Sequence, residues 1–257
     1  MVDVGSGIPL VLVPGIQGRW EWMQPSVDAL ARNYRVIAAS LPGEPGVDTS
    51  FDADADFGVF VRHLDDVLDA SGVPSAIICG VSYGGLIALR YAATRSNRVR
   101  GLILVSTPGP GWKLNDQQRR YVKWPRLAGP LFALGAARRG WRELRAMYPH
   151  RRARLSASLR AASRVVRAPA APNRMSRRAR LAENENFEAD CARVAVPTLV
   201  VTGERELDQV VPCDDTMSYL NLIDGSSFQL FERTGHLGTV LAPDQFATIV
   251  TRFCRTL

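Results

Sequence analysis

Residues 75–93 read SAIICGVSYGGLIALRYAA, and this stretch decides the fold. An apolar run typical of a buried strand leads into Gly80-Val81-Ser82-Tyr83-Gly84, and a run with helical character follows. In a G-x-S-x-G segment between a strand and a helix, the serine occupies a strained turn that projects its hydroxyl out of the backbone. Small residues are required two positions before and after it, and the following helix directs free N–H groups at the same spot. The stretch therefore predicts Ser82 as a nucleophile.

A serine hydroxyl needs a base to accept its proton, and the chain contains three histidines. His63 falls within a predicted helix and His150 within an arginine-rich segment, where a packing or surface role is expected. His236 lies in Thr234-Gly235-His236-Leu237-Gly238, a loop between a predicted strand and the last predicted helix. A loop at a strand end can reach across a site, so His236 is predicted as the base.

The base in turn needs a carboxylate to hold its tautomer. Residues 196–212 form a predicted strand followed by three acids, Glu204, Glu206 and Asp208. A nucleophilic serine, then an acid, then a histidine is the chain order of one particular hydrolytic fold.

Apolar runs alternate with runs of helical period along the rest of the chain, which predicts an α/β fold with a mainly parallel sheet flanked by helices. Strands are expected at Pro9–Val13, Tyr34–Ala39, Ala76–Gly80, Gly101–Ser106, Thr198–Thr202 and Phe228–Phe231. Helices are expected at Gln24–Arg32, Phe57–Ala70, Tyr83–Thr94 and Asp244–Arg255.

Residues 108–190, here called the basic segment, break this alternation. From Lys113 to Arg180 there are 19 lysines and arginines against two acids, Asp116 and Glu143. Helical periodicity interrupted by prolines predicts short helices lying over the carboxyl ends of the strands, where α/β folds place ligands. Within residues 151–167 an apolar face lies among arginines, and a solvated helix is favoured there over a membrane-surface helix.

With these features the chain resembles the α/β-hydrolase superfamily, in the serine-nucleophile branch with a helical lid inserted after the sixth strand. The resemblance rests on the Gly15 turn, the Gly80–Gly84 elbow, Leu104-Val105-Ser106, Asp208-x-x-Val211-Pro212, and Gly235-His236 with Pro243. It implies a core domain of residues 1–107 and 191–257, with residues 108–190 as the lid. The N-terminal hairpin of the superfamily is shortened here, since only Val2–Val4 precedes the first core strand.

The resemblance also implies roles for individual residues. Its spacing rules point to Glu206 when counted from Gly203 and to Asp208 when counted back from Pro212. Asp208 is favoured as the acid, with Glu206 as the alternative. The two oxyanion N–H donors are expected at Ile16 and Tyr83.

Three further side chains are candidates for the substrate pocket. Gln17 follows the Gly15 turn and has an amide that can point at the site, although a surface position is equally compatible with the sequence. Trp20 and Trp22 are candidates for lining the acyl pocket, with packing beneath the lid as an equal alternative.

Composition limits the remaining possibilities. No run of 18 apolar residues is present, so no transmembrane helix is expected, and the N-terminus lacks a basic signal region. A cytoplasmic protein, monomeric or homodimeric, with four reduced cysteines, no metal and no cofactor is the expectation. The arginines are not interleaved with aromatic residues in any recognised nucleic-acid motif, so no nucleic-acid partner is expected.

The predicted function is hydrolysis of an ester bond of a small molecule through a Ser82 acyl-enzyme. A cofactor-free perhydrolase or acyltransferase on the same triad is one alternative. A non-catalytic scaffold that binds partners through the basic segment is another. The basic segment is either a solvated surface or a device that steers anionic substrates to the site, and weak contact with anionic membranes is a further possibility.

Overall fold

A mostly parallel sheet forms the centre of the computed structural model, which describes residues 1–52 and 54–257, apart from the side chains of 128–134, 136 and 137. In that part of the chain the sheet has seven strands in the order β1-β3-β2-β4-β5-β6-β7. They are β1 (Val2–Val4), β2 (Pro9–Val13), β3 (Arg35–Ala38), β4 (Ala76–Val81), β5 (Val99–Val105), β6 (Thr198–Thr202) and β7 (Ser227–Leu230). Each of the six predicted strands is present, with ends shifted by no more than two residues.

The only antiparallel pair of the described sheet joins β1 to β3 at one edge. The remnant of the predicted N-terminal hairpin therefore forms a short edge strand beside β3. All other neighbours are parallel, so the carboxyl ends of β2 and β4–β7 meet at one side of the sheet.

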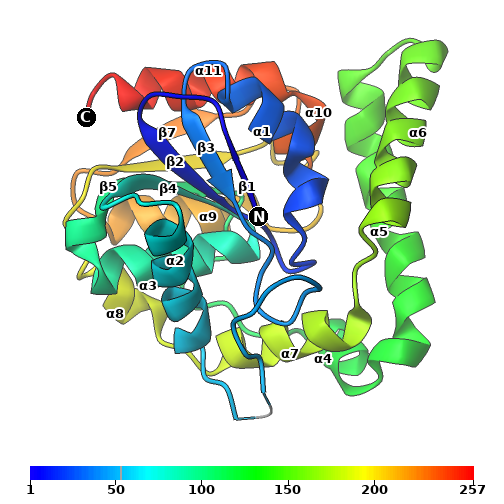
Figure 1. Cartoon of the computed structure of the whole chain (residues 1–257). Coiled ribbons are helices and arrows are strands. Elements are labelled where there is room, and N and C mark those ends of the chain that lie inside the picture. Colours follow the sequence, from blue (N-terminus) through cyan, green and yellow to red (C-terminus); the bar gives the residue numbers. More distant parts are fainter. Residues whose placement is uncertain (53) are drawn as a thin grey trace.

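Helices cover both faces, as the near-continuous Val/Ile/Leu strands require (Figure 1). Alternate residues of β4 point to opposite sides: Ile78 packs with α2 (Gly58–Ala70), α3 (Tyr83–Thr94) and α8 (Phe187–Cys191), whereas Ile77 packs with α1 (Gln24–Leu30) and α11 (Pro243–Cys254). Shorter elements complete this part: η1 (Trp20–Met23), η2 (Ser96–Arg98), α9 (Cys213–Met217), η3 (Ser218–Asn221) and α10 (Gly238–Leu241).

The basic segment is helical, as its periodicity predicts. It contains α4 (Asp116–Lys123), α5 (Pro125–Met147), α6 (Arg151–Arg167) and α7 (Pro172–Glu183), and in Figure 1 α5 and α6 stand to one side of the sheet. The expectation of short pieces is wrong for α5, which runs over 23 residues. Pro125 lies in its first turn, where a missing N–H is tolerated, and Pro130 lies inside the helix without ending it. Among the described helices, none is both long and apolar enough to cross a bilayer.

Candidate active site

The turn between β4 and α3 places Ser82 at the carboxyl edge of the sheet. Its backbone has φ 56° and ψ −124°, a strained conformation for a residue with a side chain. A Cβ on Gly80 would overlap the carbonyl group of Gly84, and a Cβ on Gly84 would overlap the carbonyl oxygen of Val13. The two glycines therefore allow the chain to make this sharp turn against β2.

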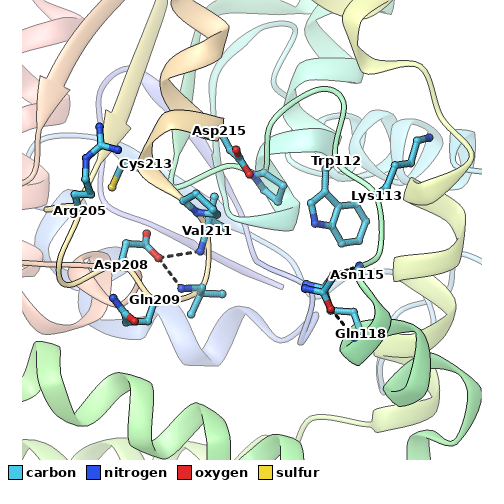
Figure 2. Close-up of a pocket in the computed structure, with 13 residues that line it drawn as sticks. Trp112, Lys113, Asn115, Gln118, Arg205, Asp208, Gln209, Val211, Cys213 and Asp215 are labelled. Carbon is cyan, nitrogen blue, oxygen red and sulfur yellow. Dashed lines mark hydrogen bonds between the residues drawn. The ribbon is translucent and has the colours of Figure 1, made fainter.

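His236 and Asp208 come from two other loops at the same edge of the sheet. The Nδ1 atom of His236 lies 3.3 Å from Oδ2 of Asp208, which is almost fully buried. The other carboxylate oxygen, Oδ1, accepts the N–H groups of Val210 at 3.0 Å and of Val211 at 2.9 Å (Figure 2). Burial alone would raise the pKa of Asp208, but the hydrogen bonds from His236 and from these two N–H groups lower it below its ordinary value. Asp208 is thus set up to be ionised beside the imidazole.

The loop after β6 explains why Asp208 rather than Glu206 faces the histidine. The N–H groups of Leu207 and Asp208 both donate to the carbonyl oxygen of Glu204, at 2.9 Å each, so the chain makes a helical turn that takes up the two extra residues. This turn leaves Glu206 exposed. On the other side, a Cβ on Gly235 would lie 2.5 Å from the carbonyl oxygen of Leu207, so the two loops can pack this closely only because residue 235 is glycine.

The predicted oxyanion donors lie on both sides of Ser82. Tyr83 is the first residue of α3, where a backbone N–H has no partner within the helix. Ile16 lies in the loop after β2, and the neighbouring Gln17 extends toward the nucleophile. The point where a Cβ on Gly15 would stand is 2.8 Å from Oε1 of Gln17 and 3.5 Å from Cβ of Ser82. Both groups therefore lie close to Gly15, and Gln17 is partly buried.

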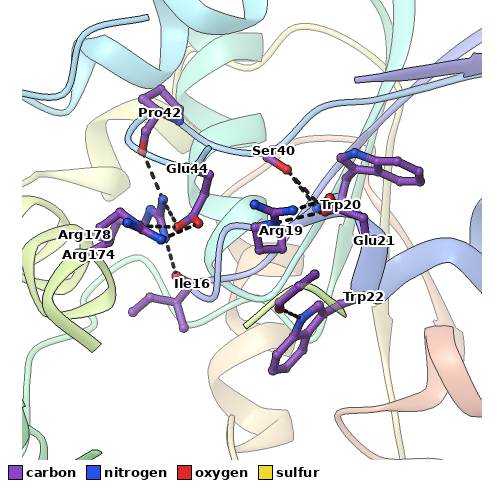
Figure 3. Close-up of polar contacts among 11 residues, drawn as sticks. Ile16, Arg19, Trp20, Glu21, Trp22, Ser40, Pro42, Glu44, Arg174 and Arg178 are labelled. Carbon is purple, nitrogen blue, oxygen red and sulfur yellow. Dashed lines mark hydrogen bonds and ion pairs between the residues drawn. The ribbon is translucent and has the colours of Figure 1, made fainter. Parts of the chain in front are cut away.

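A buried cluster fastens the loop that contains Ile16 to the basic segment. Arg178, on α7, is fully buried and donates to the carbonyl oxygens of Ile16 and Pro42, both at 3.0 Å (Figure 3). Its guanidinium also pairs with Glu44 at 2.9 Å, and Arg174 pairs with the same carboxylate at 3.0 Å. Sequence reasoning missed this role, since nothing in the pattern distinguishes Arg178 from the many surface arginines around it.

Trp20 and Trp22 have the contacts of packing residues. The indole N–H of Trp22 donates to the carbonyl oxygen of Ala168 at 2.7 Å and ties η1 to the basic segment (Figure 3). Trp20 packs against the apolar cluster beneath α1 and α11. Of the two interpretations that the sequence left open, the contacts favour packing.

A cavity of about 470 Å³ opens between the start of the basic segment and the loop after β6. Its lining includes Trp112, Gln118, Asp208 and Val211, and Figure 2 shows these side chains around the opening. Neither Ser82 nor His236 lines it. The cavity therefore reaches the predicted acid but neither the predicted nucleophile nor the predicted base.

Sequence reasoning also missed Glu143 on α5. This side chain is 2% exposed, and both of its carboxylate oxygens accept the N–H of Leu237, at 3.0 and 2.9 Å, directly after His236. A signal was present, since Glu143 is one of only two acids among 19 bases and shares a helix face with Gly140, Leu144 and Met147.

Among the remaining histidines and cysteines, Cys213 lines the cavity beside Asp208. His63 is buried in α2, where Thr49 contacts its Nδ1 atom at 3.0 Å, and His150 is exposed before α6. The four cysteines are free thiols. No cluster of three or more His, Cys, Asp or Glu suited to a metal ion occurs in the described residues.

A family assignment agrees with the geometry described above, namely the strand order, the strained serine turn and the His–Asp pair at adjacent strand ends. A model of the alpha/beta hydrolase family matches residues 10–249. The chain belongs to the alpha/beta hydrolase family.

This α/β-hydrolase is similar to a 2-hydroxymuconate semialdehyde hydrolase of Pseudomonas sp. (strain CF600), with 26% identity over 98% of this chain and 88% of the relative. Among solved structures, an esterase of Exiguobacterium antarcticum superposes with a TM-score of 0.80 at 20% identity, over 98% of this chain and 94% of that one. A meta-cleavage product hydrolase of Pseudomonas fluorescens IP01 superposes with a TM-score of 0.76 at 23% identity, over 99% and 93% of the two chains. At these identities the structural matches establish the fold and leave the substrate open.

Proposed function

We propose that this α/β-hydrolase cleaves an ester bond of a small molecule through an acyl-enzyme on Ser82. The observation that carries the proposal is the convergence of the strained Ser82 turn and the His236–Asp208 pair at one edge of the sheet. A scaffold protein has no need of a strained serine or of a buried carboxylate held against a histidine, which argues against the non-catalytic alternative.

In the proposed mechanism His236 takes the hydroxyl proton of Ser82 as the oxygen attacks the substrate carbonyl carbon. The negative charge moves to the carbonyl oxygen, where the N–H groups of Ile16 and Tyr83 receive it. His236 then protonates the leaving alcohol, and the acyl group stays on Ser82. Water, deprotonated by His236, releases the acid and restores the serine. Asp208 holds the imidazole and stabilises its charged form throughout.

A second candidate bond is a carbon–carbon bond next to a carbonyl group. It is favoured by relatives matched over nearly the whole chain, which are named as hydrolases of 2-hydroxymuconate semialdehyde and of 2-hydroxy-6-oxo-6-(2'-aminophenyl)hexa-2,4-dienoic acid. Neither name contains an ester. The same nucleophile and base serve this reaction if the leaving group is a stabilised carbanion, so a panel with an ester and a dienoic keto acid separates the two.

The basic segment supports an anionic substrate. From Lys113 to Arg180 it carries 19 bases against two acids, and its helices α5 and α7 contact the loops of His236 and Ile16. A positive field near a site raises the encounter rate of anions. For an acidic ester, kcat/KM is expected to fall steeply as the salt concentration is raised from about 20 to about 300 mM, because salt screens the attraction between exposed charges. A neutral ester of the same size is the control, and equal salt dependence of the two would remove the steering role.

The decisive experiment is labelling with a fluorophosphonate probe together with turnover of p-nitrophenyl acetate and octanoate. Labelling and turnover are expected in the natural chain and lost together in Ser82→Ala and His236→Ala. His150→Ala is the matched control and should behave like the natural chain, because His150 is exposed and remote in the fold. A folded natural chain that neither labels nor turns over would refute the proposal. Product analysis with added alcohol or peroxide separates hydrolysis from acyl transfer and perhydrolysis.

A further inference from the structure

We propose that Glu143 is a positioning residue, whose carboxylate on α5 holds the loop that carries His236 in its working position. The inference rests on the proposed function of His236 as the base. It adds that docking of the basic segment is part of assembling the site, because the contact comes from a helix nearly 100 positions away in the chain.

The geometry at Glu143 is that of a loop anchor. Both oxygens converge on the single N–H of Leu237, the residue next to His236, and the carboxylate is closed off from solvent. The Leu237 side chain is 39% exposed, although its Cδ1 atom lies close to Gly140 of α5, so the main-chain bond is the more buried of the two contacts that hold this point of the loop. A buried carboxylate is costly to place, and one whose backbone partners, Leu237 and Gly235, both flank His236 indicates a requirement at that position.

The surrounding contacts show that α5 and the His236 loop pack as one unit. The Tyr148 hydroxyl donates to the carbonyl oxygen of Leu241 at 2.7 Å, and Arg233 donates to the carbonyl oxygen of Ala146 at 3.3 Å. Leu144 and Leu241 share a small apolar cluster. Glu143 supplies the contact of this interface that lies nearest to the histidine.

The charged groups near Glu143 influence whether its carboxyl group is ionised. The pKa of Glu143 is raised to about 7, mainly by burial. The negative charge of Asp208 also raises the pKa, whereas the N–H groups of Leu237 and Gly235 and the charge of His236 lower it. Arg139 lies one turn earlier on the same helix. Below neutral pH the protonated group keeps one accepting oxygen for Leu237, while above it both oxygens accept and a negative charge stands near the imidazole.

The first test compares Glu143→Gln and Glu143→Leu in steady-state hydrolysis, with Tyr148→Phe as a control in the same interface. Glu143→Leu leaves the Leu237 N–H without its acceptor, and kcat is expected to fall about 10- to 100-fold with KM within about threefold, since small misplacements of a catalytic group have this effect. Glu143→Gln keeps a carbonyl acceptor, so it should match the natural chain at pH 6 and fall behind it through pH 7 to 9. Tyr148→Phe should retain turnover at every pH.

The second test does not depend on turnover or on the leucine variant folding. The amide of Leu237 is followed by ¹⁵N NMR between pH 5 and 9, in the natural chain and in Glu143→Gln. A titration step near pH 7 that is absent in Glu143→Gln is expected. A kcat ratio between the natural chain and Glu143→Gln that is constant over pH, or an identical Leu237 titration in both proteins, would overturn the positioning role. If His236→Ala instead hydrolyses esters normally, the proposed function fails, and that outcome is separate.

Discussion

The Arg178 guanidinium donates to the carbonyl oxygen of Ile16 across 3.0 Å, although 162 positions separate the two residues in the chain. The main-chain carbonyl of Arg178 in turn accepts the hydroxyl of Tyr83 at 2.9 Å. One residue of α7 thus contacts both residues whose N–H groups are proposed to hold the oxyanion. Helix α7 of the basic segment therefore braces the two sides of the proposed oxyanion hole.

Loss of this brace is expected to be severe. Arg178→Met leaves the fully buried Glu44 carboxylate with Arg174 alone, and removal of one partner of a buried pair costs about 3–5 kcal/mol of unfolding free energy. Urea denaturation measures this loss. Arg32→Met, which removes an exposed pair with Asp244, is the control and should cost less than about 1 kcal/mol. Equal losses in the two variants would contradict the buried-brace interpretation.

The acid of the triad can be assigned by two isosteric changes. Asp208→Asn keeps the shape but removes the charge and an acceptor facing His236, and kcat is expected to fall about 10³- to 10⁴-fold. Glu206→Gln should retain nearly full turnover because Glu206 is exposed. Steady-state kinetics of the two variants on one ester checks the assignment, and the reverse ranking would identify Glu206 as the acid.

The serine turn predicts a sharp difference between glycines. Gly84→Ala places a methyl group into the carbonyl oxygen of Val13, where the backbone must move. A loss of about 3 kcal/mol of unfolding free energy, the upper end of the usual cost of overpacking, and a loss of probe labelling are expected. Gly72, unlike Gly84, has a positive φ, 63°, but a Cβ there would meet nothing within 4 Å. The cost of Gly72→Ala is expected to be only about 1 kcal/mol, from backbone strain alone. Thermal unfolding of both proteins makes the comparison, and similar losses would show that the close approach at Gly84 is unimportant.

Stability should depend on pH through Glu143 in a defined direction. Because the folded-state pKa is raised to about 7, the native state binds the proton more tightly than the unfolded chain, and this contribution is lost as pH rises from about 4.5 to 7. The full change is about 3 kcal/mol, from the free energy of about 1.4 kcal/mol per pKa unit. Glu143→Gln has no such titration, so its stability relative to the natural chain should increase between pH 5 and pH 8 in urea denaturation. A stability difference that is the same at both pH values would mean that the folded-state pKa is not raised.

Much of the fold was predictable because the strands are fully covered. A strand that is covered by helices on both faces consists almost entirely of apolar residues. The apolar run therefore predicted the boundaries of β4, Ala76–Val81, to within one residue. Ser82 and His236 were identifiable for a similar reason, since glycines beside them record where the backbone has to turn or approach another loop closely.

The choice between Glu206 and Asp208 was harder, because it depends on a turn whose hydrogen bonds end on the carbonyl group of Glu204. Carbonyl groups are identical in every residue, so the sequence carries no mark of that turn. The same holds for Arg178 and Glu143, whose partners include the backbone atoms of Ile16 and Leu237. The amphipathic pattern of α5 indicates that one side of the helix is buried, but it does not show which part of the chain covers that side.

The long-range anchors also have a consequence for the order of folding. Glu143 to Leu237 spans 94 positions, Trp22 to Ala168 spans 146, and Arg178 to Ile16 spans 162. Contacts between such distant positions form only after the entropy of closing large loops has been overcome. The local β4–α3 turn can therefore form early on the ribosome. The loop of Ile16 reaches its final place only after residue 178 has been synthesised, and the loop of His236 only after residue 237. Activity should accordingly be among the last properties that a refolding chain recovers.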